Sequence, residues 1–443
     1  MKPAGAAGLL VVIAFGLFFL GRPAGRTQRL PAGIVQLSRP IEVPPGSHDL
    51  ELIGAPEGTV LQAAPDFSGE ALVVCRSASN IRMRNFRILG AQAPLEERLG
   101  LPPYVPFAQF TRHNGILAEN VRSLVLEDLD VAGVAGFAIL ASRCSDVSIT
   151  RVHVADSGSL DERGRNNTTG GILLEEGTTG FRVVDCNLER IRGNGIWTHS
   201  YYSSPHHRNG LIARNRFATI GRDAIQVGHG MDVRVVANLG WRIGYPAEIV
   251  DVERGGTPVG VDTAGETAHC VYAGNRFYEV NGKCIDLDGF HDGEVRDNSC
   301  INGGTAAAYP SGNFGISLNN ANPNMRPENI RIVGNTIDGA LFGGIFAIGT
   351  GHTIAWNTLR NLNLAHCNGR SNMRCLFQPD EPDFLRSGIY LARRAERPAP
   401  AEGNRIVENE ISGYGIDRHC IAAAPGVKIE RNSISGNSCR SNQ

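Results

Sequence analysis

Residues 211–217 read Leu-Ile-Ala-Arg-Asn-Arg-Phe, an apolar segment that ends in an asparagine followed by one further apolar residue. Seven later segments follow the same pattern, with their asparagines at Asn238, Asn275, Asn298, Asn335, Asn357, Asn409 and Asn432. The intervals between the eight asparagines are 23, 37, 23, 37, 22, 52 and 23 residues, so a unit of 22–23 residues with insertions accounts for all of them. A fixed period of this length is typical of a solenoid, in which each unit buries its apolar side chains against its neighbours.

A second short element alternates with the first and begins with isoleucine or valine, often after glycine. Its copies start at Ile116, Ile139, Ile172, Ile196, Ile225, Val261, Ile285, Ile316, Ile345, Ile389 and Ile421. Each alternates with a period of two, which predicts a strand whose first and third residues point inward. Asparagine and glycine tolerate left-handed backbone, so we expect the asparagine column in a turn, where each amide can bond to the next coil.

The composition agrees with one long repetitive body. The 443 residues include 54 glycines and are 42% hydrophobic, which excludes global disorder, and the net charge of −1 gives no field that would gather nucleic acid or anionic lipid. The chain lacks a leucine-rich consensus, and a propeller would need blades of about 40 residues. We therefore expect an all-β, single-domain right-handed parallel β-helix (a β-solenoid) of about eleven coils with loop insertions.

The first residues of the repetitive region look like an opening coil. Residues 50–54 read Leu-Glu-Leu-Ile-Gly, and Gly-Thr-Val-Leu-Gln follows at residues 58–62. Together with the repeat, this makes the chain resemble the pectin-lyase-like superfamily over roughly residues 45–435, which includes polysaccharide lyases and polygalacturonases. The resemblance implies the fold, while the chemistry has to be argued from the site itself.

The N-terminus predicts export. An apolar run of fifteen residues, 6–20, follows Lys2, which fits a secretory signal and falls short of the ~20 residues that span a bilayer. We assign residues 1–25 to a signal peptide, or alternatively to a membrane anchor, residues 26–44 to a linker and residues 45–443 to the β-helix. The protein is then secreted, periplasmic or at the cell surface, and it meets a membrane only through that anchor.

Ten cysteines are compatible with export. Cys367 with Cys375 and Cys420 with Cys439 are candidate disulfides. Several of the others are expected to be small buried hydrophobic residues. No CxxC pair points to a metal, and we predict no metal or other cofactor, although clustered carboxylates could hold Ca²⁺.

The outward residues of the second strands concentrate polar chemistry in the middle of the chain. If these strands stack in register, the first outward column reads Leu117, Leu140, Leu173, Trp197, Gln226, Asp262, Asp286, Ser317, Phe346 and Tyr390. The second column reads Glu119, Ser142, Glu175, His199, Gly228, Ala264, Asp288, Asn319, Ile348 and Ala392. The position two before each strand start holds Asn194, Asp223, Val259, Lys283 and Phe314. Ionisable residues therefore gather between Ile196 and Ile316, and the flanking coils carry mostly apolar or uncharged residues at these positions.

Carboxylates on neighbouring coils suggest acid–base catalysis. Asp262 and Asp286 would lie about 5 Å apart, and Asp288, pointing the same way, would lie about 6–7 Å from Asp286 and about 8 Å from Asp262. These three separations cover both the retaining and the inverting arrangements of glycosidase carboxylates. Crowding of like charges should raise the pKa of one of the carboxyl groups. Lys283 is one of only three lysines and could hold a carboxylate ionised, bind an acidic sugar or act as a base. The predicted catalytic residues are Asp262, Asp286, Asp288, Asp223, Lys283 and His291.

Two short segments are similar to known catalytic motifs. Residues 221–230 resemble the polygalacturonase segment with a Gly-Asp-Asp pair, but only its second aspartate is matched, by Asp223, because Arg222 replaces the first. Asp288-Gly-Phe-His-Asp292 resembles the Asp-x-His-Asp signature of β-helical alginate epimerases with one extra residue. His229 and His291 suit acid–base work because an unperturbed histidine titrates near neutrality.

Four insertions, at residues 92–114, 159–169, 199–209 and 241–258, are expected to overhang this face. Aromatic rings beside carboxylates suit a saccharide, whose apolar ring faces stack while its hydroxyls form hydrogen bonds. The predicted substrate-binding residues are Trp197, His199, Tyr201, Tyr202, Arg222, Gln226, His229, Asp292 and Asn319.

Three functions remain open on the sequence. The first is an exported enzyme that hydrolyses glycosidic bonds of a polysaccharide, and the second is a lyase or C5-epimerase acting on a uronic-acid polymer. The third is a non-catalytic surface solenoid that binds glycan or partners. The acidic column could also be a charge ladder with a purely structural role.

Overall fold

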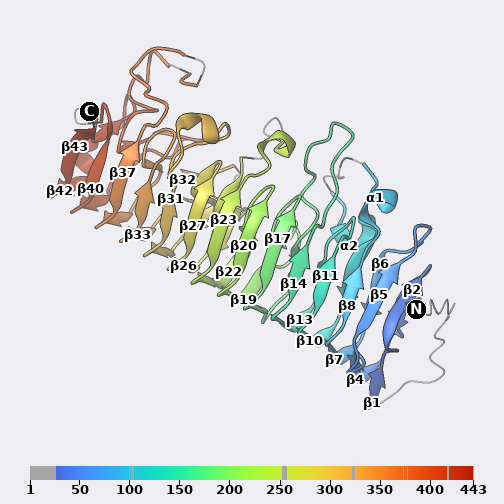
Figure 1. The fold of residues 1–443 in the computed structure, drawn as a ribbon. Helices are drawn as coiled ribbons and strands as arrows, with labels where there is room; N and C mark the ends of the chain where they lie inside the picture. The colour runs from blue at the N-terminus through green and yellow to red at the C-terminus, as the bar shows by residue number, and fades with distance from the viewer. Residues whose placement is uncertain are drawn as a thin grey trace, which may run out of the picture.

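In the computed structural model, the described residues are 26–98, 100, 104–251, 257–321, 325–372, 374–376, 378–416 and 419–442. Their strands form three long sheets in which every neighbouring pair is parallel, and each turn of the chain adds one strand to each sheet. Figure 1 shows the resulting elongated stack, with the first coils at one end and the last coils at the other. The chain is thus a single parallel β-helix over its described length.

The three sheets, called A, B and C, follow one another in each coil. Sheet A contains β1 Arg26–Arg29, β4 His48–Ile53, β7 Ser79–Arg84, β10 Arg122–Glu127, β13 Ser145–Thr150, β16 Arg182–Val184, β19 His207–Ala213, β22 Gly230–Val236, β26 Val271–Ala273, β30 Glu294–Arg296, β33 Arg331–Val333, β36 Thr353–Ala355, β39 Arg405–Val407 and β42 Ser433–Ser435, with β25 Thr267–Ala268 and β29 Phe290–His291 beside them. Sheet B contains β2 Gly33–Leu37, β5 Thr59–Ala63, β8 Arg87–Leu89, β11 Asp130–Ala132, β14 His153–Ala155, β17 Asn187–Ile191, β20 Arg216–Ile220, β23 Leu239–Ile243, β27 Arg276–Val280, β31 Ser299–Ile301, β34 Thr336–Asp338, β37 Thr358–Leu362, β40 Glu410–Tyr414 and β43 Ser438–Asn442. Sheet C contains β3 Ile41–Val43, β6 Ala71–Arg76, β9 Asn114–Glu119, β12 Ile139–Ser142, β15 Ile172–Glu175, β18 Ile196–His199, β21 Ile225–Gly228, β24 Val259–Ala264, β28 Lys283–Asp288, β32 Ile316–Asn319, β35 Ile345–Ala347, β38 Ile389–Leu391 and β41 Ile421–Ala423.

The register predicted for the second strands is confirmed along sheet C. Ile116 pairs with Ile139, and the same column continues strand by strand to Ile389 and Ile421. These side chains lie inside the helix in one continuous apolar core with the inward residues of the other two sheets. The alternation of inward and outward side chains therefore fixes which residues reach the outer face of sheet C.

Two predictions about the N-terminal part are wrong. Residues 26–44, expected to be a linker, form the first coil, because β1, β2 and β3 pair with β4, β5 and β6. Sheet C accordingly has 13 strands rather than eleven. Its first two strands, β3 and β6, lack the glycine-isoleucine start by which the others were counted. The predicted signal or anchor at residues 1–25 lies outside the described residues.

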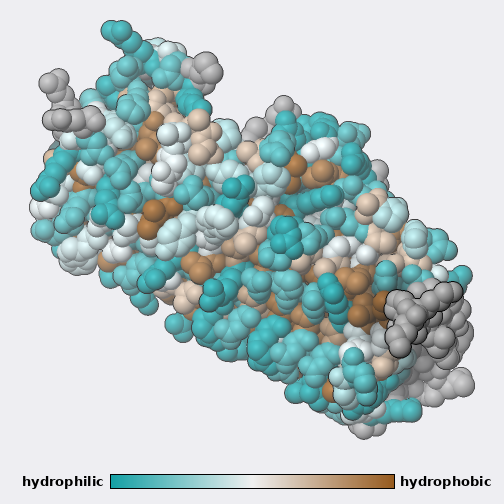
Figure 2. All heavy atoms as spheres, in the orientation of Figure 1, coloured by the Kyte–Doolittle hydropathy of each residue, from teal (hydrophilic) through white to brown (hydrophobic). Residues whose placement is uncertain are grey.

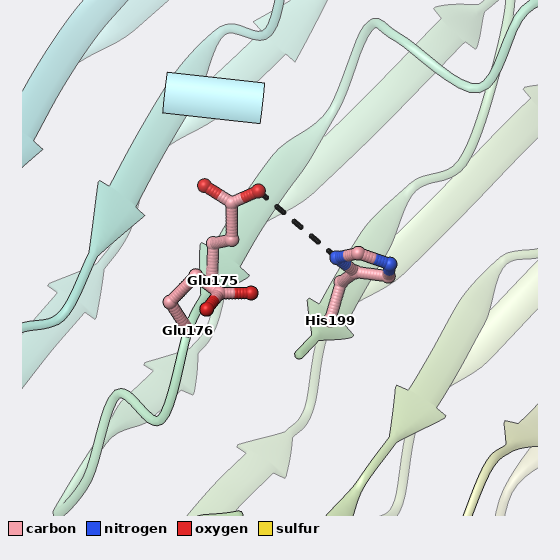
Figure 3. A group of neighbouring side chains, drawn as sticks. All are labelled: Glu175, Glu176 and His199. Carbon is pink, nitrogen blue, oxygen red and sulfur yellow. Dashed lines mark ion pairs between the residues drawn. The ribbon is translucent and has the colours of Figure 1, made fainter. Parts of the chain in front are cut away.

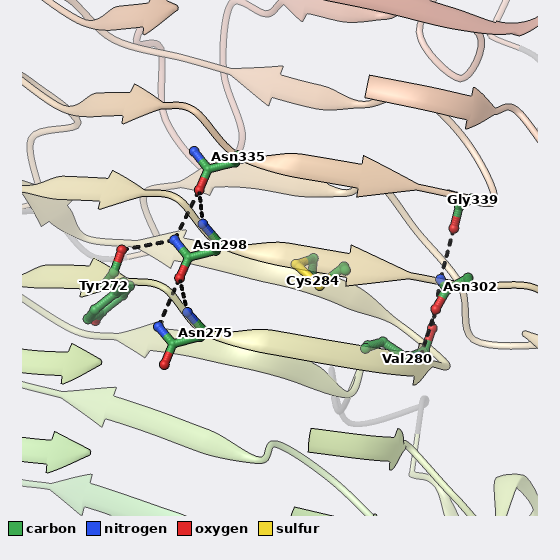
Figure 4. The surroundings of a disulfide bond; sticks show 9 residues. Tyr272, Asn275, Val280, Cys284, Asn298, Asn302, Asn335 and Gly339 are labelled. Atoms are coloured by element: carbon green, nitrogen blue, oxygen red, sulfur yellow. Dashed lines mark hydrogen bonds between the residues drawn. A yellow bond between two sulfur atoms is a disulfide. The ribbon is translucent and has the colours of Figure 1, made fainter. Parts of the chain in front are cut away.

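The asparagine column forms a hydrogen-bonded ladder between sheets A and B. The side-chain amide of each asparagine donates to the side-chain oxygen of the next, at 2.8–3.0 Å, from Asn215 through Asn238, Asn275, Asn298, Asn335, Asn357 and Asn409 to Asn437. The backbone N–H groups donate to the same oxygens, as Figure 4 shows for the middle three coils. The ladder was predicted, but its last member is Asn437 rather than Asn432.

The error at the last member has a local cause. Asn432 belongs to a shorter second ladder in which it accepts a hydrogen bond from the Asn404 backbone, and Asn404 accepts one from His352. The strand register pairs Arg405 with Ser433, which places Asn437 opposite Asn409. The left-handed backbone expected for the column also sits one residue earlier, at positions such as Arg214 and Trp356, and not at the asparagines themselves.

Three disulfides are present. Cys367–Cys375 and Cys420–Cys439 were predicted, whereas Cys284–Cys300, which joins sheet C to sheet B inside the core (Figure 4), was not. The remaining cysteines, Cys75, Cys144, Cys186 and Cys270, are buried thiols, and burial raises the pKa of each. This confirms that several cysteines serve as small apolar core residues.

The insertions flank sheet C on both edges. Those between sheets B and C carry α1 Gln92–Leu95, α2 Phe107–Phe110, and the 3₁₀ turns η1 Ala247–Ile249 and η3 Ala306–Ala308. They project from one edge of the stack (Figure 1), where the surface is mostly hydrophilic (Figure 2). They touch in series, since Glu96 accepts from the Leu160 backbone and Arg163 bonds to Asp251 at 2.7 Å. The insertion after β18 leads to sheet A and so lies on the opposite edge.

A further 3₁₀ turn, η4 Ile429–Arg431, lies near the C-terminus. Within the described part of the chain, none of the helices has the length and apolar character needed to cross a membrane.

The ladder makes a prediction about stability. Replacing Asn298 by alanine removes the oxygen that accepts from the Asn275 backbone and side-chain amide, and the amide that donates to the Tyr272 carbonyl, so we expect a loss of about 3 kcal/mol in the free energy of unfolding. Asn437→Ala, at the less buried end of the ladder where water can replace the lost bonds, should cost under about 1 kcal/mol. Urea unfolding of both variants measures the difference, and equal losses would contradict the ladder's role.

Candidate functional site

The polar outer column of sheet C is confirmed on four consecutive strands. Gln226 on β21 pairs with Asp262 on β24, Asp262 pairs with Asp286 on β28, and Asp286 pairs with Ser317 on β32. Asp223 lies just before β21 and Lys283 at the start of β28. Both are close to Asp262, since the charges of both affect its pKa. Asp223, Asp262, Lys283, Asp286 and Asp288 are called the acid–lysine cluster below.

Two side chains donate hydrogen bonds to Asp286. Its Oδ2 accepts a hydrogen bond from Lys283 Nζ at 2.6 Å, and its Oδ1 accepts one from the Ser317 hydroxyl at 2.6 Å. Burial alone would lower the pKa of Lys283, but the attraction of Asp286 and the neighbouring aspartates outweighs it and the pKa is raised. Lys283 therefore stays protonated, so the structure does not support it as a catalytic base.

Asp262 is in a different environment. Its Oδ2 accepts a hydrogen bond from Gln226 Nε2 at 2.5 Å, and the Gln226 oxygen in turn accepts one from Asn194 at 3.1 Å. Burial, followed by the charges of Asp223 and Asp286, raises the pKa of Asp262 well above that of an ordinary aspartate. Asn194 thus fixes which end of the Gln226 amide faces Asp262.

Asp223 and Asp288 complete the cluster. Asp223 is 3% exposed, against 8% for Asp262 and Asp286, and its Oδ1 accepts a hydrogen bond from the Val259 backbone at 2.9 Å. Burial raises the pKa of Asp223 to about 7, although the charge of Arg222 acts in the opposite direction. Burial also raises the pKa of the less buried Asp288 to about 6, against a hydrogen bond from the Ala321 backbone.

His291 and Asp292 do not join the cluster. The chain turns at Gly289, whose φ is 79°, and carries His291 onto β29 beside sheet A. There His291 Nδ1 bonds to Asp292 at 2.8 Å, and Asp292 also accepts a hydrogen bond from Asn329. Among the described residues no hydrogen bond or ion pair links either of them to the acid–lysine cluster. The structure thus places both residues on the sheet A side of the turn, and their roles in the site stay predictions.

The predicted aromatic and histidine residues lie on the coils just before the cluster. Trp197 packs on Phe107 and Phe137 in a second apolar cluster outside the helix, which also contains Ala71, Val74, Ala108, Leu117, Leu140 and Leu173. His199 contacts Trp197 and Tyr201, and Tyr202 packs edge-on against His229 with ring centroids 4.3 Å apart. Of these, Tyr202 is exposed. These residues border the site on its N-terminal side.

Arg222 and Asn319 lie at the two ends of the cluster. The charge of Arg222 acts on Asp223, and its buried Nε has no hydrogen-bond partner. Asn319 pairs in register with Asp288, and its side-chain oxygen accepts a hydrogen bond from the Asn320 backbone.

The residues best placed to bind one metal ion together are not the clustered aspartates that were considered for Ca²⁺. Among the described residues, a single set of three carboxylate or imidazole groups has its ligand atoms within 4.8 Å of one another, and it is Glu175, Glu176 and His199. The calcium alternative therefore gains no support at the aspartates. Glu175 stood in the outward column, but nothing in the sequence near Glu176 indicated that it would turn toward His199.

Comparisons with known proteins agree with this architecture. Residues 71–243 match a family model described as a right handed beta helix region. The N-terminal fragment of bacteriophage phi29 gene product 12 is similar in structure, with a TM-score of 0.59 at 14% identity, covering 93% of this chain and 66% of that one. PfbA, a surface adhesin of Streptococcus pneumoniae, has a TM-score of 0.52 at 14% identity over 76% of this chain and 82% of its own.

The Dettilon tailspike protein has a TM-score of 0.51 at 16% identity, covering 92% of this chain and 63% of its own. This chain thus spans just under two thirds of the tailspike protein and of the gene product 12 fragment. No curated protein matches it in sequence. The chain is a right-handed parallel β-helix, and the likenesses, all at low identity, define its fold alone.

The environment of Asp223 predicts a pH-dependent stability. Because its pKa is raised in the folded state, the folded protein binds more protons than the unfolded chain, and this contribution to stability is lost as the pH rises from about 4 through about 7. Asp223→Asn keeps the oxygen that accepts from Val259 and removes the charge. We expect the variant to be roughly 1–3 kcal/mol more stable than the wild type at pH 8 and equal to it near pH 4. Urea unfolding at both pH values tests this, and an unchanged difference would contradict it.

Proposed function

We propose that this protein is a carbohydrate-active enzyme that hydrolyses a glycosidic bond of a polysaccharide bound along the outer face of sheet C. The observation that carries the proposal is the unlike environment of Asp262 and Asp286. The two residues are register partners on adjacent strands, so their backbones lie about 4.8 Å apart. Glycosidases need two such carboxyl groups, one protonated and one ionised.

Asp286 takes the role of the ionised group. The ammonium of Lys283 and the hydroxyl of Ser317 both donate hydrogen bonds to it. A carboxylate held in this way can remove a proton from the attacking water or attack the anomeric carbon directly. Lys283 and Ser317 are then positioning residues that fix the orientation of the carboxylate.

Asp262 takes the role of the general acid. Burial and the neighbouring negative charges keep it protonated at a pH at which an ordinary aspartate has lost its proton. Since the Gln226 amide donates to its Oδ2, the acidic proton is on Oδ1, from which it passes to the glycosidic oxygen of the leaving sugar. Asn194 and Gln226 therefore position the acid, and Asp223 helps to keep it protonated.

The contacts of Lys283 favour hydrolysis over elimination. A uronate lyase or C5-epimerase needs a free base for the C5 proton and a cation to neutralise the sugar carboxylate. Lys283 is protonated and already bonded to Asp286, and His291, the other base considered, lies outside the cluster. A non-catalytic glycan-binding solenoid would bind the same polysaccharide but would release no product.

The three disulfides support an exported location. Disulfides persist in oxidising compartments and are rare in the cytosol. Export to the periplasm, the cell surface or the medium would also bring the protein to polysaccharides. This location is part of the proposal.

Removing either carboxylate should abolish hydrolysis. We expect Asp262→Asn and Asp286→Asn each to lower kcat by about 10³-fold or more, because each removes a proton-transfer or charge-stabilising group from the reacting centre. The measurement is the release of new reducing ends from a panel of polysaccharides, with ultraviolet absorbance recorded in parallel to detect unsaturated lyase products. His291→Gln serves as the matched control and should retain wild-type activity.

Other results would overturn parts of this proposal. Unsaturated products would replace the hydrolase by a lyase acting at the same site. Folded wild-type protein that binds a polysaccharide without releasing reducing ends or unsaturated products would establish the binding solenoid instead. Full activity in Asp286→Asn would remove the acid–lysine cluster from the chemistry.

The pH dependence should identify the acid. A general acid works only while protonated, so kcat/KM should fall as the pH rises through the raised pKa of Asp262. The charge of Asp223 contributes to that raised pKa, so Asp223→Asn should move the alkaline limb of the profile to lower pH. A pH–rate profile of wild type and variant measures the shift. An unmoved limb, or one that moves to higher pH, would mean that Asp262 is not the acid.

A further inference from the structure

Two buried glutamates and a histidine converge beside α2. Glu175 and His199 are register partners at the ends of β15 and β18, and Glu176 follows Glu175 in the chain. Figure 3 shows the three side chains gathered at one place, with Glu175 facing His199. Glu175 is 0% exposed and Glu176 is 7% exposed, so both carboxylates have left bulk water.

The charge of this group has no partner in the described part of the protein. No arginine or lysine there forms an ion pair with Glu175 or Glu176, whereas Glu119 on the same column binds two arginines. Burying a carboxylate without a cation is costly, and here two such groups lie together. A bound cation would offset this cost.

The imidazole of His199 gives an independent indication. Its Nδ1 atom is buried and has no hydrogen-bond partner. The nearest carboxylate atom, Glu175 Oε1, lies 4.0 Å away, which is too long for a hydrogen bond. Two ligands on one tetrahedral transition-metal ion, each at about 2.0–2.2 Å from it, would lie slightly closer together than this.

Both carboxylates are oriented from outside the group. The two oxygens of Glu175 accept hydrogen bonds from the backbone N–H groups of Phe107 and Ala108 in α2. The oxygens of Glu176 accept from the Tyr201 backbone and the Ser204 hydroxyl. A carboxylate oxygen has two lone pairs, so each oxygen can still bind a cation, and metal-binding carboxylates are commonly held by such outer donors.

We propose that Glu175, Glu176 and His199 bind a divalent transition-metal ion of the zinc type, through Nδ1 and one oxygen of each carboxylate. A mixed imidazole and carboxylate set suits zinc and its neighbours, whereas Ca²⁺ takes six to eight oxygens. The sequence predicted no metal, because these ligands come from a strand end, the turn after it and the next coil. The site is separate from the acid–lysine cluster and does not depend on the proposed hydrolysis.

The ion would fasten two insertions to sheet C. The donors that orient Glu175 belong to the insertion with α2, and those that orient Glu176 belong to the insertion after β18. Binding of the ion to the folded state alone stabilises that state. We therefore expect the metal to be structural and to raise the melting temperature.

Zinc binding by the full-length protein tests the proposal. The chain is stripped with a chelator and titrated calorimetrically with Zn²⁺, and a parallel titration uses Ca²⁺. We expect one Zn²⁺ per chain and a rise in melting temperature, and a far weaker response to Ca²⁺. His199→Gln should weaken Zn²⁺ binding by at least tenfold and abolish the thermal shift. His269→Gln, which changes an exposed histidine outside the group, should behave as the wild type.

Far-ultraviolet circular dichroism shows whether each variant is folded, and Glu176→Gln takes the place of His199→Gln if the latter does not fold. The proposal is overturned if folded wild-type protein neither binds Zn²⁺ nor gains thermal stability. It is equally overturned if the folded ligand variant binds Zn²⁺ as tightly as His269→Gln does. Binding of Ca²⁺ as tight as that of Zn²⁺ would reject the transition-metal assignment.

Discussion

The backbone hydrogen bonds between successive coils are the constraint on which this structure depends. A strand in the middle of the stack can satisfy its N–H and C=O groups only through the coils before and after it, and all three sheets do so with parallel pairing. A slip by one residue would turn the inward isoleucines to the outside, so the register is fixed. Residues some 23–37 positions apart in sequence are thereby brought to the spacing of one strand, as with Gln226, Asp262 and Asp286.

The same stacking produces two columns with opposite character. The asparagine ladder is neutral and uses both the donor and the acceptor of each amide, so every member stabilises the next. The aspartate column cannot do this, because carboxylates only accept when ionised and repel one another. It is held by its neutral column neighbours Gln226 and Ser317 and by Lys283, which all donate to the carboxyl groups.

Repetition explains how much could be predicted from the sequence. The period and the alternation gave the fold, the register of sheet C and the contact between Asp262 and Asp286, because these follow from regular strands. Irregular features were missed where the chain departs from the repeat. Gly289 carries His291 to another sheet, a shift of five residues places Asn437 in the ladder, and the first coil lacks the repeat's glycine-isoleucine start. Side-chain pairing through turns, as at Glu176 and at Cys284–Cys300, leaves no periodic signal.

The N-terminal coils show which residues occupy the outward positions of sheet C away from the acid–lysine cluster. There Leu117, Leu140 and Leu173 occupy the column that holds Asp262 and Asp286 further on, and the insertion with α2 covers them to form a second apolar cluster. The backbone and register are the same in both places, so the fold accepts apolar residues in this column. Burying Asp262 and Asp286 in this column, with Asp223 beside it, instead raises the cost of the charged state, as the raised pKa values of Asp223 and Asp262 show. Leucines under a covering insertion, or a neutral ladder like that of the asparagines, would stabilise the folded state more than aspartates in this column. The comparison therefore supports the catalytic role proposed for the acid–lysine cluster over a purely structural one.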